Sequence, residues 1–254
     1  MQELKRRVGR ICVAWLLAVI GAVIPLSAQS IEFRYEDHPP FTFEKDGEPA
    51  GIFIGITEQS AKLAGFNIIW KKSTFNRLKR DLEEGVERFC VTGHSKASDS
   101  EGKWHTTEAI GHFGRAGFLV RAEDRPDFLK VGSLQALFEK TEFVGGFVKG
   151  AVYAVPYEKF LATSHSKHLI TSSTHEQLVQ LVAKGRLDFV FINDVMLPSQ
   201  QALAEGDAKL DFVTFSEMPY GASAHIRCTK AFPAAQVARL NRGILEATKK
   251  AAQE

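Results

Sequence analysis

Short runs of β-branched and aromatic residues alternate with helical stretches from Ile31 to the end of the chain. This alternation is typical of an α/β protein in which mostly parallel sheets are flanked by helices. Strands are expected at 31–35, 66–70, 88–92, 113–120, 142–146, 168–171, 189–192, 212–215 and 222–228, with helices at about 54–64, 76–84 and from 233 onward.

The ends of the expected helices carry recognisable residues. Gly65 and Gly85 follow the first two helices, and glycine readily adopts the left-handed conformation that closes a helix. Ser173 and Glu176 have the spacing of a capping box, which predicts a further helix that starts at Ser173 and ends before Gly185.

The N-terminal segment has the order of a cleavable secretory signal. Basic residues within 5–10 precede an apolar stretch over 11–26, and small or polar residues follow at 27–30. A retained membrane anchor is the alternative, but the stretch is short and is interrupted by Gly21 and Pro25. We therefore expect residues 1–28 to be a signal peptide, with the rest working in the periplasm without a lipid anchor.

Charge and motifs exclude several functions. The whole chain carries a formal net charge of +2, and residues 1–28 contribute four cations and one anion, so the remainder carries −1. This balance does not favour nucleic-acid binding. The remainder contains no Cys-x-x-Cys, His-Glu-x-x-His, phosphate-loop or dinucleotide motif. We accordingly expect no cofactor, no metal and no catalytic residues.

Two segments have the composition of crossings between lobes. Residues 121–127 are charged and contain Pro126, while residues 216–221 contain the sequence Met-Pro-Tyr-Gly. Ordinary surface turns are the alternative for each. If both are hinges, residues 29–121 and 219–254 form a discontinuous first lobe and residues 122–218 form the second.

Several motifs together resemble one protein family. They are the stretch His38-Pro-Pro-Phe-Thr-Phe43, the stretch Gly51-Ile-Phe-Ile-Gly-Ile56, and LVQLVAKGRLDFVFIND at residues 178–194. In this order they resemble bacterial extracellular solute-binding proteins of family 3, which supply amino-acid and related ABC importers. The resemblance implies a two-lobed periplasmic-binding-protein fold with a small-molecule ligand between the lobes. It also implies a monomer whose partner is a permease or sensor in the inner membrane.

The chain departs from that family where an amino-acid ligand is held. The family places an arginine in the loop after the strand that ends here at Thr92, and its guanidinium grips the ligand carboxylate. Residues 93–104 contain no arginine. The family's adjacent threonines correspond to Ala151-Val152, and its aspartate corresponds to Asn193, with Asp194 next to it. The resemblance therefore implies a ligand other than a standard α-amino acid.

The candidate ligand-binding residues combine aromatic walls with a few polar groups. Arg77 is a possible replacement for the missing arginine, and His94 is the best titrating candidate; solvated or ordinary loop residues are the alternatives, as core packing is for the phenylalanines. The expected set is Tyr35, Phe41, Phe75, Arg77, Thr92, His94, Tyr153, Asn193 and Asp194.

Two cysteines, Cys90 and Cys228, follow the signal segment. In an oxidising compartment this even number permits one bridge, and a pair of buried thiols is the alternative. A subset of family-3-like proteins resembles this chain in having one cysteine before a glycine-containing loop and another before Ser/Thr-Lys. That resemblance implies a Cys90–Cys228 disulfide.

Two other functions remain open on the same scaffold. One is an enzyme, dehydratase-like, or an accessory factor; the sequence pairs no acid with a base at a readable spacing. The other is a non-binding lobe pair for protein contacts. A space filled by Phe75 and Tyr153 would favour the non-binding pair, whereas convergence of Arg77, Asn193 and Asp194 would favour ligand binding.

Overall fold

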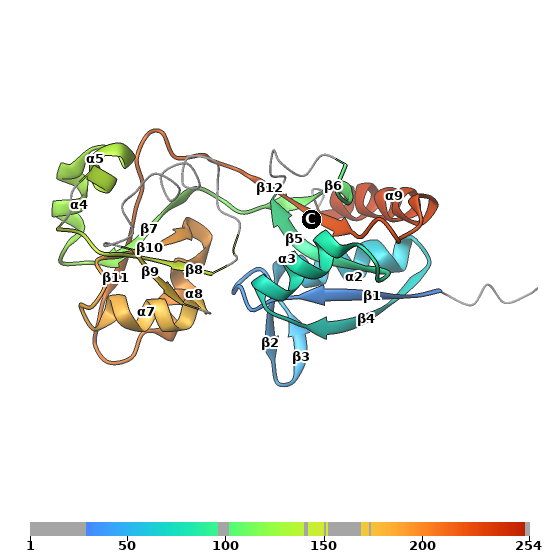
Figure 1. Cartoon of the computed structure of the whole chain (residues 1–254), viewed down its shortest axis with the longest axis horizontal. Coiled ribbons are helices and arrows are strands. Elements are labelled where there is room, and N and C mark those ends of the chain that lie inside the picture. Colours follow the sequence, from blue (N-terminus) through green and yellow to red (C-terminus); the bar gives the residue numbers. More distant parts are fainter. Residues whose placement is uncertain are drawn as a thin grey trace, which may run out of the picture.

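The computed structural model describes residues 29–95, 102–139, 142–149, 151, 169–172 and 174–251. Within them the chain forms two five-stranded sheets and a small two-stranded sheet, with helices packed on both large sheets. Figure 1 shows the two large sheets in separate lobes. The predicted α/β, two-lobed architecture is confirmed, while the predicted signal peptide and Tyr153 lie outside the described residues.

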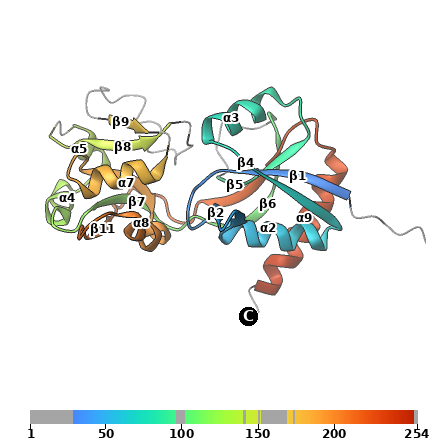
Figure 2. The same cartoon turned by 90° about the horizontal axis from the view of Figure 1, so that it is seen from below.

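The first sheet has the strand order β4-β1-β5-β12-β6. Strand β1 runs parallel to β4 and β5, and β12 is antiparallel to β5 and β6. Helices α2 and α9 cover one face and α3 covers the other (Figure 2). The bounds are β1 Gln29–Tyr35, β4 Phe66–Lys72, β5 Phe89–Ser95, β6 His105–His112, β12 Ser223–Cys228, α2 Ile52–Leu63, α3 Phe75–Glu84 and α9 Ala234–Ala251, with β2 (Phe43–Lys45) and β3 (Glu48–Ala50) as a separate hairpin.

The second sheet has the strand order β11-β7-β10-β8-β9. Strands β10, β8 and β9 are parallel, and β7 is antiparallel to both β10 and β11. Helices α4 and α5 pack on one face of this sheet through a cluster rich in phenylalanine, and α7 packs on the other face. The bounds are β7 Ala116–Arg121, β8 Gly145–Val148, β9 Leu169–Ser172, β10 Phe189–Asn193, β11 Leu210–Val213, α4 Arg125–Val131, α5 Leu134–Glu139, α7 His175–Ala183, η3 Asp194–Met196 and α8 Leu197–Leu203.

The first crossing between the lobes lies one strand earlier than predicted. Because β7 pairs with β10 and β11, it belongs to the second sheet, and the chain crosses through residues 113–115. The predicted hinge at 121–127 is instead anchored within the second lobe. Arg121 donates hydrogen bonds to the carbonyl oxygens of Val182 (3.1 Å) and Leu187 (2.8 Å), and Pro126 stands in the first turn of α4, where its missing N–H costs nothing.

The other crossing lies near its predicted place, because residues 214–222 join β11 of the second sheet to β12 of the first. The strand β6 was not predicted at all. Its side chains are mostly polar and only partly buried, so its sequence lacks the apolar run or clear alternation that indicates a strand.

Helix ends follow the sequence closely, with one shift. Gly65 and Gly85 adopt positive φ angles of 72° and 65° after α2 and α3, as predicted. The N-cap of α7, however, is Thr174 rather than Ser173, because the Thr174 hydroxyl accepts a hydrogen bond from the Gln177 N–H at 3.3 Å. Ser173 itself lies outside the described residues.

The predicted Cys90–Cys228 disulfide is confirmed by the structure. Cys90 of β5 and Cys228 of β12 are directly paired across neighbouring antiparallel strands, and their sulfur atoms are 1.96 Å apart. The bond joins the two parts of the discontinuous first lobe, and its cysteines are 138 positions apart in sequence. Both cysteines are fully buried in the apolar cluster between the sheet and its helices.

Candidate functional site

The two lobes touch where residues 36–42, which follow β1, meet the starts of α7 and α8. The carbonyl oxygen of Pro39 accepts hydrogen bonds from Ser199 Oγ at 3.3 Å and from Gln200 Nε2 at 3.4 Å. The ring of His38 stacks on the ring of His175, with centroids 5.2 Å apart and planes within 5°. We call this region, with its first-lobe residues Glu36, His38 and His94 and its second-lobe residues His175 and Gln200, the inter-lobe contact.

The His38 ring lies in an aromatic setting supplied by the first lobe. Its centroid is 5.1 Å from that of Phe41, 5.9 Å from Phe75 and 6.2 Å from Phe113. Enclosure by these rings removes water from the imidazole, and His175 and His94 disfavour a further positive charge, so the pKa of His38 is held well below its usual value. His38 is therefore neutral near pH 7.

His175 is the first residue of α7 and is buried against the first lobe. Burial lowers the pKa of His175 to about 4, so this imidazole is also neutral near pH 7. Two neutral rings can stack without charge repulsion. Neither histidine was predicted from the sequence as a site residue, although His38 lies inside one of the motifs that carry the family resemblance.

Glu36 is a carboxylate in the interior, with only 3% of its surface exposed. It directly follows the end of β1, and its Oε1 lies 3.7 Å from His94 Nε2, which is beyond hydrogen-bonding distance. The structure thus brings an acid and a base together that the sequence had not paired.

Four buried polar atoms at the inter-lobe contact have no hydrogen-bond partner. They are Glu36 Oε2, His94 Nε2, His175 Nδ1 and Gln200 Oε1. Buried polar side-chain atoms are nearly always hydrogen-bonded in native proteins. Such a concentration, with members from both lobes, marks this contact as the candidate site.

Three of the predicted site residues serve the core of the first lobe. Tyr35 packs edge-on against Trp70 at 5.8 Å, and Phe41 stacks on Phe53 at 4.9 Å. Thr92 is fully buried, and its hydroxyl exchanges a 2.6 Å hydrogen bond with that of Thr57 on α2. Of these three, only Phe41 reaches the inter-lobe contact, through its edge against His38.

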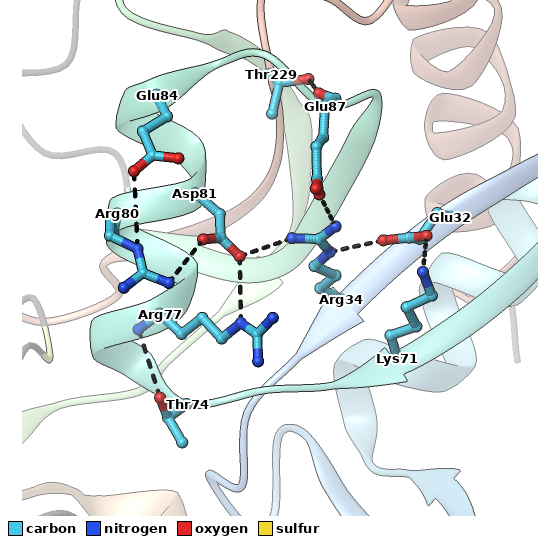
Figure 3. A network of polar contacts seen from close by, with 10 residues as sticks. All are labelled: Glu32, Arg34, Lys71, Thr74, Arg77, Arg80, Asp81, Glu84, Glu87 and Thr229. Carbon is cyan, nitrogen blue, oxygen red and sulfur yellow. Dashed lines mark hydrogen bonds and ion pairs between the residues drawn. The ribbon is translucent and has the colours of Figure 1, made fainter.

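Arg77 does not join the inter-lobe contact. Its side chain is 69% exposed and its guanidinium lies 3.7 Å from the carboxylate of Asp81 on the same helix (Figure 3). Phe75, at the first position of this helix, does reach His38. The helix α3 therefore presents an aromatic ring to the site and keeps its arginine outside.

Asn193 and Asp194 hold the first crossing. Asn193 caps the short helix η3. Asp194 Oδ1 accepts hydrogen bonds from the backbone N–H of Arg115 at 3.0 Å and of Val195 at 2.8 Å, and its own N–H donates to the Arg115 carbonyl at 2.9 Å. A side chain at Gly114 would approach Asp194 Oδ1 to 2.2 Å, so glycine is required beside this anchor.

A polar network under α3 fixes the helix that carries Phe75 (Figure 3). The guanidinium of Arg34 pairs with Glu32 and Asp81, both at 2.7 Å, and with Glu87. It also lies 3.8 Å from the centroid of the Phe89 ring. Burial opposes the charge, but the hydrogen bonds and negative charges of Glu87 and Glu32 outweigh it and raise the pKa of Arg34. The network joins β1, α3 and the start of β5, and it is structural.

Two further properties concern the described residues as a whole. In the part of the chain that the structure describes, no three histidine, cysteine or acidic side chains are grouped so that they could hold a metal ion. Among the helices described, none is both long enough and apolar enough to cross a membrane.

Comparisons with known proteins identify the fold. No protein-family model matches the chain, and no curated protein matches it in sequence. An ancestral arginine-binding protein bound to arginine is similar in structure, with 18% identity, coverage of 88% of this chain and 94% of that chain, and a TM-score of 0.70.

Two other solved structures are also similar. One is an amino acid ABC transporter substrate-binding protein from Streptococcus pneumoniae bound to L-arginine, with 17% identity, 87% and 89% coverage and a TM-score of 0.67. The other is a histidine kinase sensor domain with similarity to periplasmic binding proteins, with 16% identity, 89% and 93% coverage and a TM-score of 0.68. At these identities the likeness shows the fold, which is that of the periplasmic binding proteins.

Proposed function

We propose that this chain is a periplasmic solute-binding protein that captures a small polar molecule between its two lobes. The observation that carries the proposal is the set of unpartnered buried atoms at the inter-lobe contact, on Glu36, His94, His175 and Gln200. Each unsatisfied buried group costs about 1–3 kcal/mol. A contact that served packing alone would have no reason to keep four of them, whereas a polar ligand would supply their partners.

The geometry of the contact fits binding coupled to closure. Its polar groups come from both lobes, and in the described part of the chain the lobes are joined by short segments, 113–115 and 214–222. A ligand that contacts both lobes stabilises the closed arrangement by its differential affinity, as in hinged domain closure.

The ligand that we propose is not a standard α-amino acid. Residues 93–104 offer no arginine for a carboxylate, and Arg77 is paired with Asp81 on the outer side of α3. Asp194 is engaged with the backbone of Arg115. The first two features leave no fork of donors for a ligand carboxylate, and the third leaves Asp194 Oδ1 bonded to the backbone rather than to a ligand amine.

The same proposal includes a partner and a location, and the similar structures support both. The similar structures include a transporter substrate-binding protein and a sensor domain. We therefore expect a monomer that delivers its ligand to an ABC permease or to a sensor in the inner membrane. Binding rather than catalysis is its proposed role.

A thermal-shift screen of amino acids, organic acids, polyamines and cyclic acids tests the proposal. A ligand present at 100 times its Kd stabilises the native state by about 2.7 kcal/mol, which is about 5–10 °C in Tm for a chain of this size. The shift should shrink in a His175→Ala variant and persist in Lys184→Ala, which changes an exposed residue at the other end of α7. If no compound class raises the Tm, the proposed function is wrong.

A second candidate is an enzyme on the same scaffold. The observation that favours it is the proximity of Glu36 and His94, because an acid and a base 3.7 Å apart in the interior could exchange a proton with a bound substrate. Chromatography of each stabilising compound after incubation with the protein would decide. Conversion that is lost in His94→Gln, with binding retained, would establish catalysis.

A further inference from the structure

The unpartnered atoms at the inter-lobe contact indicate which class of ligand fits, and this inference rests on the proposed function. Gln200 Nε2 donates to the Pro39 carbonyl, which can only accept, so the other amide atom of Gln200 is the oxygen and is an acceptor. Glu36 Oε2 also accepts when the carboxylate is ionised. Both of these oxygens are acceptors, so a ligand that satisfies them must carry hydrogen-bond donors.

The lack of a paired cation at Glu36 in the described part of the chain also favours a ligand that brings hydrogen-bond donors, and a positively charged one in particular. Among the described residues no lysine or arginine pairs with Glu36; Lys72 pairs with Asp37 and Glu44, and Arg77 pairs with Asp81. The His94 imidazole lies 3.7 Å from Glu36 and is not hydrogen-bonded to it. A buried carboxylate without a counter-charge is costly, and a bound cation removes that cost.

The wall of the site is flat and aromatic. The His38 ring is flanked by Phe41 and Phe75, and the His175 ring lies on it with the two planes within 5°. His175 therefore already covers one face of the His38 ring, and the two phenylalanine rings beside it make this wall apolar. A bare metal ion fits less well, because no group of three or more metal-ligating side chains occurs in the described part of the chain.

We propose that the ligand is a small organic cation without a carboxylate group, whose N–H groups donate to Glu36 and Gln200. Amidines and guanidines belong to this class. Their paired N–H donors suit a carboxylate on one lobe and an amide oxygen on the other.

Calorimetric titration with matched probes tests the class. Benzamidine and benzoate have nearly the same shape and opposite charges, and agmatine is L-arginine without its carboxylate. Benzamidine should bind at least about tenfold more tightly than benzoate, and agmatine at least about tenfold more tightly than L-arginine, as expected for one buried charge-assisted contact.

Variants then assign the contact. Glu36→Gln should weaken benzamidine binding by about tenfold or more, whereas Glu44→Gln, at a carboxylate that is 42% exposed and paired with Lys72, should leave it unchanged. Gln200→Met removes the acceptor of the second lobe and should also weaken benzamidine binding. It tests the site even if Glu36→Gln does not fold. Circular dichroism of each variant establishes which ones fold.

Three results would overturn the inference. Tighter binding of benzoate or L-arginine than of its cationic counterpart would refute the ligand class while leaving the proposed binding function standing. Unchanged benzamidine affinity in both Glu36→Gln and Gln200→Met would refute the site. If none of the four probes binds, the ligand class is wrong, and the wider thermal-shift screen alone decides whether the protein binds a solute.

Discussion

Acidification should destabilise this fold through the buried imidazole of His175. In the unfolded chain a histidine has a pKa of about 6.5, whereas burial in the folded protein lowers the pKa of His175 to about 4. Above about pH 6.5 the ring is neutral in both states and contributes no pH dependence. As the pH falls from there to about 4, the unfolded state binds a proton that the folded state refuses, so stability is lost over this window.

The two pKa values set the size of the effect. At about pH 5 the unfolded state gains about 2 kcal/mol relative to the folded state, and at about pH 4 it gains about 3 kcal/mol. The pKa of His38 is shifted in the same direction by burial and by the neighbouring histidines, so it adds to the loss.

Urea unfolding at a series of pH values, followed by the fluorescence of Trp70 and Trp104, measures this loss. The wild-type protein should lose stability between about pH 7 and pH 5, and a His175→Gln variant should lose about 2 kcal/mol less over the same range. His112→Gln, which removes an imidazole from an exposed residue, is the matched control and should follow the wild type. Parallel curves for wild type and His175→Gln would refute the assigned burial of this ring.

Two further predictions concern the first lobe. Replacing both Cys90 and Cys228 by alanine should cost about 2–5 kcal/mol in urea unfolding, because the bond closes a loop with a sequence separation of 138 residues; a loss below about 1 kcal/mol would contradict this. Asp81→Asn should cost about 1–3 kcal/mol, since it removes a carboxylate that is 13% exposed from Arg34, whereas Glu84→Gln, at an exposed ion pair, should cost less than about 0.5 kcal/mol. Equal losses in these two variants would show that the network does not stabilise the lobe.

Much of the fold can be predicted from the sequence, because the relevant signals are local. The alternation of strands and helices, and the glycines that end α2 and α3, depend on residues within a few positions of one another. The disulfide was implied by family resemblance rather than by geometry, and the pairing of β5 with β12 explains it. Burial of Phe41 in the core agrees with the alternative given for the phenylalanines, whereas burial of Thr92 was not predicted.

The candidate site was predicted less well. Phe75 and His94 do lie at the inter-lobe contact, but Arg77 pairs along its own helix and Asp194 holds the crossing at Arg115. Motif matching gives a residue a place in the chain. It does not say which neighbour will satisfy its charge or its hydrogen bonds first.

The sequence by itself determined the fold class, the helix ends and the absence of an arginine after Thr92. Only the tertiary structure decided that β7 belongs to the second sheet, that His38 stacks on His175, and that Glu36 lies beside His94. The reason is physical. Strand and helix signals arise from short-range periodicity, whereas sheet membership and buried unpartnered groups arise from contacts between segments far apart in the chain, which no local pattern records.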